Sequence, residues 1–178
     1  MSELEEIQER TEALNLEFLL IGGLAVIEHG FARFTTDIDL LVRKRQSDSW
    51  NRLVFELGYK LLNDGGSFLQ YERPGIAWRP LDLMLVNDPT YEELKASSLA
   101  ANVLGASLRI VSLKHLLILK LHALKQAKIH RFLNDFSDVV ELVIANRLDL
   151  QSPEYRDLFL KYGTPDLYEK VQRIAKSE

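Results

Sequence analysis

The chain has 178 residues, no cysteine and a formal net charge of −4 at pH 7. This length suits one domain with or without a helical appendage, and the lack of cysteine excludes disulfides, thiolate catalysis and cysteine-ligated zinc. The charge does not favour a nucleic-acid or membrane partner, the acidic start is no targeting signal, and no apolar run could span a membrane, so we expect a soluble cytoplasmic protein.

The N-terminal part predicts alternating helices and strands. Ser2 and Glu5 have the spacing of a capping box, which predicts a helix over 2–14. The apolar run that follows predicts a buried strand over 17–21. We then expect a helix over 24–29 closed by Gly30, a strand over 37–42 and a helix over 47–57 ended by Gly58.

The middle of the chain predicts further strands, and the rest predicts only helices. The turn at 64–66 predicts a hairpin between strands over 59–63 and 68–72. We expect strands over 81–86 and 107–111, a brief helix capped by Thr90 and Glu93, and helices over 113–129, 135–146, 154–161 and 166–176. The fold class is α/β (α+β), with a mixed sheet flanked by helices at 1–111 and a helical part at 112–178 packed on it.

The candidate functional residues are a glycine pair and three aspartates. Gly22 and Gly23 stand between a strand and a helix, where backbone N–H groups can contact phosphate, although a plain tight turn is the alternative. Asp37 and Asp39 are two residues apart on a strand and therefore share a face, and Asp82 begins another strand. Converging carboxylates repel one another unless a cation neutralises them. The alternative is that each aspartate only begins a strand or ends a turn.

Hard oxygen ligands of this kind suit Mg²⁺ or Mn²⁺, and such ions support in-line displacement at phosphorus. The pattern therefore predicts a site for a metal-bound polyphosphate. Arg33 either binds phosphate there or stays solvated in its loop. We interpret His29 as a residue that interacts with a helix dipole, and not as a ligand.

The pattern of Gly22-Gly23, Arg33, Thr36, Asp37 and Asp39, with Asp82 on a later strand, resembles the nucleotidyltransferase superfamily of the DNA polymerase beta type. The stretch GGLAVIEHGFARFTTDIDLLV most resembles the minimal bacterial transferases grouped with AbiEii-type toxins. The resemblance implies the corresponding fold and the transfer of a nucleoside monophosphate from an NTP such as ATP. It assigns the three aspartates to metal and catalysis, and Gly22, Gly23, Arg33 and Thr36 to the nucleotide.

Lys120 lies on the leucine-rich face of its expected helix, so it must extend to solvent, pair or point into a cleft. The AbiEii-type pattern has such a lysine, followed by an acidic segment that Asp135 and Asp138 match, with Asn134 in place of the usual arginine. The resemblance implies that Lys120 is catalytic and contacts the triphosphate, and that Asp138 orients Lys120 or the nucleotide. Alternatively, the two aspartates occupy the first turn of a helix.

The segment from Arg109 to Arg131 has six Lys or Arg and no acidic residue. It could attract a triphosphate or an RNA backbone, or it is a solvated helix face. The resemblance further implies a tRNA 3′ end or another RNA as acceptor and an antitoxin-like protein partner, as in a toxin–antitoxin system. A protein or aminoglycoside hydroxyl is an alternative acceptor, and a non-catalytic nucleotide- or partner-binding module of the same fold is the alternative function.

Overall fold

The computed structural model describes residues 1–75, 78–126 and 129–177, without the side chains of residues 126–131. The contacts along the chain divide it into two compact units. Unit 1 comprises Met1–Glu28 and Arg33–Ser112, and unit 2 comprises His29–Ala32 and Leu113–Glu178. The short segment His29–Ala32 therefore interrupts unit 1 between its second helix and its second strand.

The described part of unit 1 is built around a seven-stranded mixed sheet with the order β3-β4-β5-β2-β1-β7-β6. The strands β2 and β5 run parallel, as do β1 and β7, and the other neighbours are antiparallel. The strands are β1 Phe18–Leu20, β2 Ile38–Arg43, β3 Lys60–Asp64, β4 Phe68–Glu72, β5 Leu81–Val86, β6 Leu99–Val103 and β7 Ala106–Ile110.

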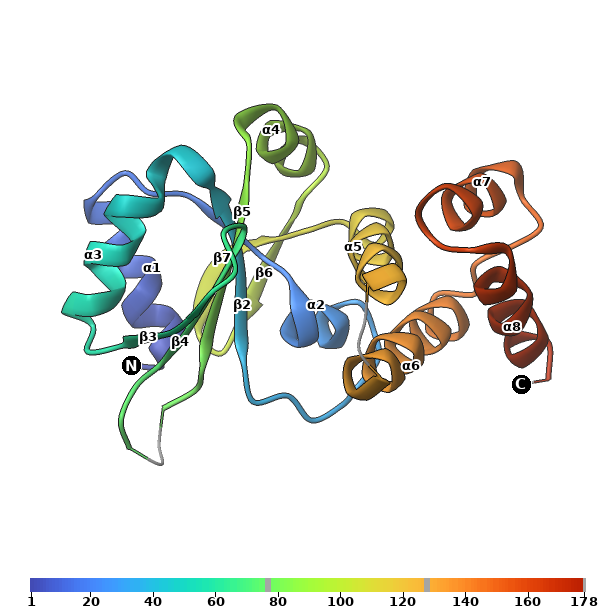
Figure 1. Ribbon diagram of the computed structural model, residues 1–178, viewed down its shortest axis with the longest axis horizontal. Coiled ribbons are helices and arrows are strands. Elements are labelled where there is room, and N and C mark those ends of the chain that lie inside the picture. Colours follow the sequence, from blue (N-terminus) through green and yellow to red (C-terminus); the bar gives the residue numbers. More distant parts are fainter. Residues whose placement is uncertain (76–77, 127–128, 178) are drawn as a thin grey trace. The chain divides into compact units, whose positions relative to one another are not determined.

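Helices cover both faces of this sheet (Figure 1). The helices α1 and α3 lie on one face, and α2 and α4 lie on the other. Their bounds are α1 Glu3–Ala13, α2 Gly22–Glu28, α3 Ser47–Glu56, preceded by the 3-10 turn Lys44–Gln46, and α4 Asp88–Ala96. The result is a three-layer α/β unit in which both faces of the central strands are covered.

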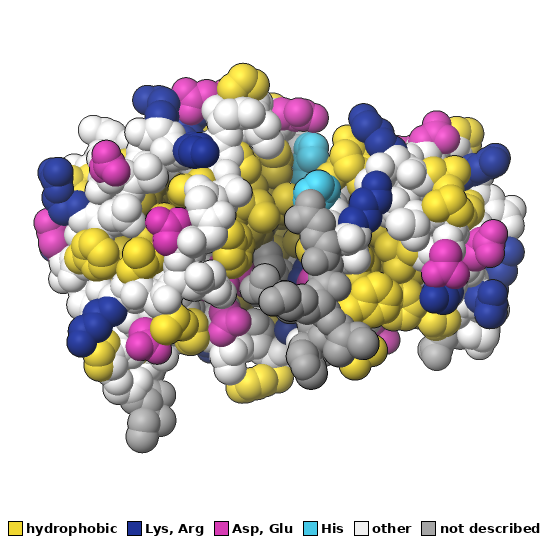
Figure 2. All heavy atoms as spheres, viewed as in Figure 1, with side chains coloured by type: hydrophobic (Ala, Val, Ile, Leu, Met, Phe, Trp, Pro, Cys, Tyr) yellow, Lys and Arg dark blue, Asp and Glu magenta, His cyan; other side chains and the backbone are white. Residues whose placement is uncertain are grey.

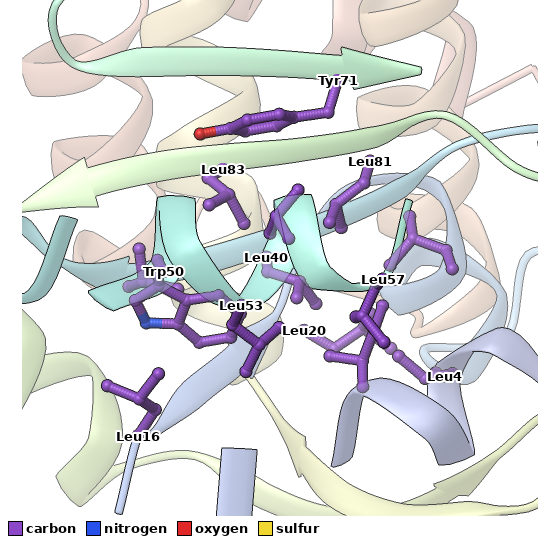
Figure 3. Packing of buried hydrophobic residues seen from close by; sticks show 14 of the residues in the cluster. Leu4, Leu16, Leu20, Leu40, Trp50, Leu53, Leu57, Tyr71, Leu81 and Leu83 are labelled. Atoms are coloured by element: carbon purple, nitrogen blue, oxygen red, sulfur yellow. The ribbon is translucent and has the colours of Figure 1, made fainter. Parts of the chain in front are cut away.

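The main core of unit 1 lies between the sheet and the pair α1 and α3 (Figure 3). Strand alternation sends every second residue of β2 to this face, among them the fully buried Leu40. Trp50 and Leu53 from α3 and Leu4 from α1 pack against the same layer. The residues between these core positions, such as Asp39 on β2, therefore face the side of α2 and α4.

The far end of β2 is held on that second face by Arg43. Its buried guanidinium pairs with Glu17 at 3.0 Å and Glu92 at 2.6 Å, and it lies 4.1 Å from the centre of the Tyr91 ring. The pairing raises the pKa of Arg43, because the two glutamates outweigh the effect of burial, which alone would lower it. This cluster joins β2 to α4.

Unit 2 is helical. It consists of α5 Leu113–Gln126, α6 Ile129–Ala145, α7 Pro153–Tyr162 and α8 Pro165–Ala175. The helix α5 packs against α6 and α7, and α8 packs against α6 and α7. The segment His29–Ala32 joins this unit through the Asn146 side chain, whose Nδ2 donates to the His29 carbonyl at 2.9 Å. In the described parts of the chain, no helix is both long and apolar enough to cross a membrane.

The predicted class, a mixed α/β sheet with helices, is confirmed, and the capping box of Ser2 and Glu5 is present. Three details were wrong. The helix α2 begins at Gly22 and not at 24, and the cap of α4 is Asn87, whose side chain accepts from the Thr90 N–H. The helix α6 begins at Ile129 and not at 135, because no Gly or Pro between these residues stops it.

The strand β6 was not predicted. It pairs with β7 through a two-residue turn, in which Leu104 and Gly105 have φ of 51° and 90°. Two positive φ values are typical of a hairpin turn whose usual sequence is Asn-Gly or Asp-Gly. A leucine rarely adopts a positive φ, so Leu104 gives no sequence signal for this hairpin turn.

Replacing a core leucine on β2 tests this packing. We expect Leu40→Ala to lower the free energy of unfolding by about 2–5 kcal/mol, because it leaves a cavity in a filled layer. Leu62→Ala is the matched control, since Leu62 is 65% exposed on the edge strand β3, and it should change stability by less than about 0.5 kcal/mol. Urea unfolding followed by tryptophan fluorescence measures both variants, and equal losses would contradict the assigned core.

Candidate functional site

The end of β1 brings a glycine against an aspartate of β2. The Ile21 N–H donates to the Asp39 carbonyl at 3.0 Å, which continues the antiparallel pairing of the two strands by one residue. Gly22 then turns the chain into α2 with a φ of +64°. A Cβ on Gly22 would lie 1.9 Å from Oδ2 of Asp39. Only glycine therefore allows the turn and the Asp39 carboxylate to occupy this place together.

The strand β5 brings a second carboxylate to the same place. Asp82 is the register partner of Asp39 in the parallel pair of β2 and β5, so both side chains leave the same face of the sheet. Asp82 is buried, with 4% of its surface exposed, and Asp39 is half-buried. Oδ2 of Asp82 accepts a hydrogen bond from Nε2 of Gln70 on β4 at 3.2 Å. Two acidic side chains are thus adjacent on two central strands of unit 1.

Asp37 lies one residue before β2 and is half-buried. Its Oδ1 accepts a hydrogen bond from the Thr36 hydroxyl at 2.7 Å. Within the described residues, no three His, Cys, Asp or Glu side chains come close enough to share one ion. Asp39 and Asp82 still fit Mg²⁺, because proteins usually hold this ion through one or two carboxylates together with substrate phosphates.

The second glycine lies against the loop that leads to β2. A Cβ on Gly23 would lie 2.4 Å from the Thr35 hydroxyl and 2.8 Å from Nη2 of Arg33. The predicted residue Arg33 therefore reaches the glycine turn, where its guanidinium adds positive charge. The hydroxyl of the predicted residue Thr36 donates instead to Asp37, and it is Thr35 that lies against Gly23.

Lys120 is the centre of a buried ionic cluster within unit 2. Its Nζ lies 2.6 Å from Oδ1 of Asp135 and 2.7 Å from Oδ2 of Asp138. The exposed fraction of the side chain is 11% for Lys120, 16% for Asp135 and 1% for Asp138. Burial alone would lower the pKa of Lys120, but the attraction of the two carboxylates outweighs it and raises the pKa. The structure thus brings Lys120 together with both Asp135 and Asp138.

The first-turn interpretation of these aspartates was wrong, because α6 begins at Ile129 and both lie further along it. Other cations of the basic segment also have partners. Lys114 pairs with Glu154 at 2.8 Å, and Arg109 donates to the Ser98 hydroxyl and carbonyl, each at 2.6 Å. The side chains of Lys128, His130 and Arg131 lie outside the described residues.

Charges of both signs are mixed on the visible surface of unit 1. Over α1, α3 and α4, Figure 2 shows Lys and Arg side chains interspersed with Asp and Glu. Such a mixture produces no strong field of one sign over this face. The view therefore adds no argument for a nucleic acid bound to this side of unit 1.

No family model matches the sequence, and no curated protein matches it either. Solved structures do match. An antigenic nucleotidyltransferase-like protein from Paracoccidioides brasiliensis is 16% identical with a TM-score of 0.58, over 98% of this chain and 91% of that one. The chain has a nucleotidyltransferase fold.

Two antibiotic-modifying enzymes share this fold. The lincosamide adenylyltransferase LnuA, solved with lincomycin, is 18% identical with a TM-score of 0.56, over 80% of this chain and 96% of that one. The enzyme ANT(2″)-Ia, solved with adenylyl-2″-tobramycin, is 18% identical with a TM-score of 0.54, over 96% and 91% of the two chains. The predicted nucleotidyltransferase fold is therefore confirmed.

The sequence did not point to Gln70 or Thr35. Gln70 alternates with the buried Leu69 and Tyr71, so its place on the second face of β4 could have been read from the pattern. Its position opposite Asp82 could not, because it depends on the register of β4 with β5. Thr35 gave no signal beside Thr36, since the loop around both has no periodic pattern.

Adding one methyl group at Gly22 tests the close approach to Asp39. Gly66 is the matched control, because it also has a positive φ, +79°, but nothing lies within 4 Å of its Cβ position. We expect Gly66→Ala to cost about 1–2 kcal/mol from the left-handed backbone. Gly22→Ala should cost about 1–3 kcal/mol more, as overpacking does. Urea unfolding gives both values, and equal costs would mean that the contact with Asp39 is not tight.

Removing the charge of Lys120 tests the cluster in unit 2. We expect Lys120→Met to cost about 3–5 kcal/mol at neutral pH, because it leaves two buried carboxylates without their cation. Lys170→Met is the control, since Lys170 and Asp166 form an exposed pair at 2.8 Å, and it should cost less than about 0.5 kcal/mol. Urea unfolding followed by far-UV circular dichroism measures the difference.

The pH dependence of the same variants gives a second check. The pKa of Lys120 is raised, so its contribution is complete below the ordinary lysine pKa of about 10.4 and is lost only as the pH rises through the raised value. The difference between variant and wild type should therefore stay constant from neutral pH up to the ordinary lysine pKa and shrink only above it. A difference that already shrinks well below that pKa would contradict the cluster.

Proposed function

We propose that this protein is a metal-dependent nucleotidyltransferase, which moves a nucleoside monophosphate from an NTP to an acceptor hydroxyl. The observation that carries the proposal is the arrangement of Gly22, Asp39 and Asp82 at one end of the central strands. A chain that served only as a scaffold would have no need to place two carboxylates side by side against a glycine turn, because their repulsion costs stability.

The chemistry assigned to the site is a displacement at the α-phosphorus. The acceptor oxygen forms a bond to this phosphorus, the bond to the β-phosphate oxygen breaks, and pyrophosphate leaves. Asp82 helps to activate the acceptor hydroxyl by taking its proton. Asp39 and Asp82 would hold Mg²⁺ or Mn²⁺, which would neutralise charge on the triphosphate. The assignment of Asp37 to the metal stays a prediction.

The remaining roles rest on the resemblance to AbiEii-type transferases. Gly22 and Gly23 would let the triphosphate approach the backbone N–H groups, and Arg33 beside Gly23 would add positive charge. Thr36 would assist at the nucleotide. The assignment of Lys120 to the triphosphate, with Asp138 as its orienting partner, stays a prediction, as does the division into a catalytic core at 1–111 and a helical part at 112–178.

Two classes of acceptor are candidates. The AbiEii-type resemblance favours an RNA such as a tRNA 3′ end, together with an antitoxin-like partner protein. The similarity to LnuA and ANT(2″)-Ia supports a small antibiotic hydroxyl instead, because their solved complexes contain lincomycin and adenylyl-2″-tobramycin. Both acceptors require the same core chemistry, so the choice does not change the proposed site.

The alternative function is a non-catalytic module that binds a nucleotide or a partner. Isothermal titration calorimetry separates a metal-dependent site from a metal-independent scaffold. A carboxylate site predicts that Mg²⁺ strengthens the binding of an NTP, because the ion would neutralise carboxylates that otherwise repel the triphosphate. Equal affinity with and without Mg²⁺ would favour the non-catalytic module.

Labelled transfer tests the proposal directly. The protein, Mg²⁺ and each α-labelled NTP are incubated with tRNA, with a protein mixture, or with aminoglycoside and lincosamide antibiotics. We expect label on one acceptor class and a loss of at least about a hundredfold in Asp39→Asn, since even residues behind the metal ligands cost 10–100-fold. Asp166→Asn, on a 74% exposed side chain, is the matched control and should retain full activity.

Two outcomes would contradict the proposal at different levels. Absence of label on every acceptor would contradict the transferase function. Full activity in the double variant Asp37→Ala/Asp39→Ala would leave the function standing and refute the site.

A further inference from the structure

A row of polar side chains crosses four neighbouring strands and ends at the candidate site. The register pairs Asn63 on β3 with Gln70 on β4, Gln70 with Asp82 on β5, and Asp82 with Asp39 on β2. Register partners extend from the same face of a sheet. All four side chains therefore lie on the face opposite the core, in a continuous line from the edge strand to the candidate site.

Both side-chain amides in this row donate their hydrogen bonds toward Asp82. Nδ2 of Asn63 donates to Oε1 of Gln70 at 3.3 Å, and Nε2 of Gln70 donates to Oδ2 of Asp82 at 3.2 Å. An ionised carboxylate only accepts, so it requires the NH₂ end of the Gln70 amide. The carbonyl oxygen of the same Gln70 amide accepts from the NH₂ group of Asn63. Rotation of the Gln70 amide by a half turn would place like atoms against each other on both sides.

Because Asp82 is buried, its hydrogen bond from Gln70 is important for the orientation of the carboxylate. Only 4% of Asp82 is exposed, whereas Gln70 is half-buried and Asn63 is exposed. A buried carboxylate depends on protein donors for its orientation, because water reaches it poorly. The donor from Gln70 binds one oxygen of Asp82 and thereby restrains the rotation of the carboxylate.

We propose that Gln70 is a positioning residue that orients the Asp82 carboxylate for the acceptor hydroxyl, and that Asn63 keeps the Gln70 amide in the required orientation. The inference rests on the proposed transfer, in which Asp82 takes the proton of the acceptor. Gln70 lies on the side of Asp82 away from Asp39, as the strand order β4-β5-β2 requires. The row therefore extends the functional surface of unit 1 onto the β3–β4 hairpin.

Kinetics of the full-length protein test the coupling. Gln70→Leu should lower kcat by about 10–100-fold, as the loss of a partner behind a reacting group does, with the KM for the NTP unchanged. Asn63→Ala should lower kcat in the same direction by less, and it should have no further effect in a Gln70→Leu background, because Asn63 acts through Gln70. An unchanged urea midpoint separates lost positioning from lost folding.

The opposite edge of the sheet supplies a matched control. Asn102 on β6 donates across the strands to the Ser107 hydroxyl at 3.5 Å, so it is an exposed side-chain amide that, like Asn63, donates to its register partner. Asn102→Ala should leave kcat and KM unchanged. Equal losses in Asn102→Ala and Asn63→Ala would mean that the effect is a general one on the sheet, and would overturn the inference.

A spectroscopic readout needs neither substrate nor metal. In ¹⁵N-labelled protein, the Gln70 side-chain NH₂ signal is assigned by its absence in Gln70→Leu. It should move toward the position of a solvent-exposed amide in Asp82→Ala and stay in place in the control Asn102→Ala. An unmoved signal in Asp82→Ala, or full kcat in Gln70→Leu, overturns the inference. A wild-type protein without transferase activity overturns the proposed function instead, and the amide signal then decides whether Gln70 orients Asp82.

Discussion

The register of β2 is the constraint on which the candidate site depends. Side chains alternate along a strand, so a shift of one residue would turn Asp39 into the core and Leu40 out of it. The strand is held at both ends on its second face. Gly22 lies against Asp39 at one end, and Arg43 pairs with Glu17 and Glu92 at the other. The apolar layer over Leu40 fixes the opposite face.

The two units handle buried charge in different ways. Asp82 in unit 1 lies beside another carboxylate and receives a neutral amide donor from Gln70. Lys120 in unit 2 pairs with two carboxylates, those of Asp135 and Asp138. A cluster of that kind is a strong structural element, because breaking it leaves an ion buried without its partner. In the proposed function, a metal cation would balance the two carboxylates of unit 1.

The predictable part of the fold is the part with local signals. Ser2 and Glu5 specified the start of α1, and the alternation in 81–86 specified β5 with its correct bounds. The strand β6 was missed because Leu104 occupies a turn position that glycine or asparagine usually fills.

The residues of the candidate site, too, were predictable only where a local sequence signal exists. The sequence could identify Gly22, Asp39 and Asp82, because strand ends and glycine turns are visible in the pattern. It could not identify Gln70 or Thr35, since their positions depend on which strands pair and on how the loop before β2 folds. Long-range register is the information that one sequence does not carry.

The segment His29–Ala32 has a consequence for how the chain can be divided. The chain enters unit 2 between the glycine turn at Gly22 and the loop with Arg33, and it leaves again within four residues. Unit 2 is therefore not a separable appendage. A truncation after Ser112 would also remove the Asn146 side chain, which donates a hydrogen bond to the His29 carbonyl. Any fragment intended to represent the sheet alone would have a loosened loop between its glycine turn and its first aspartate.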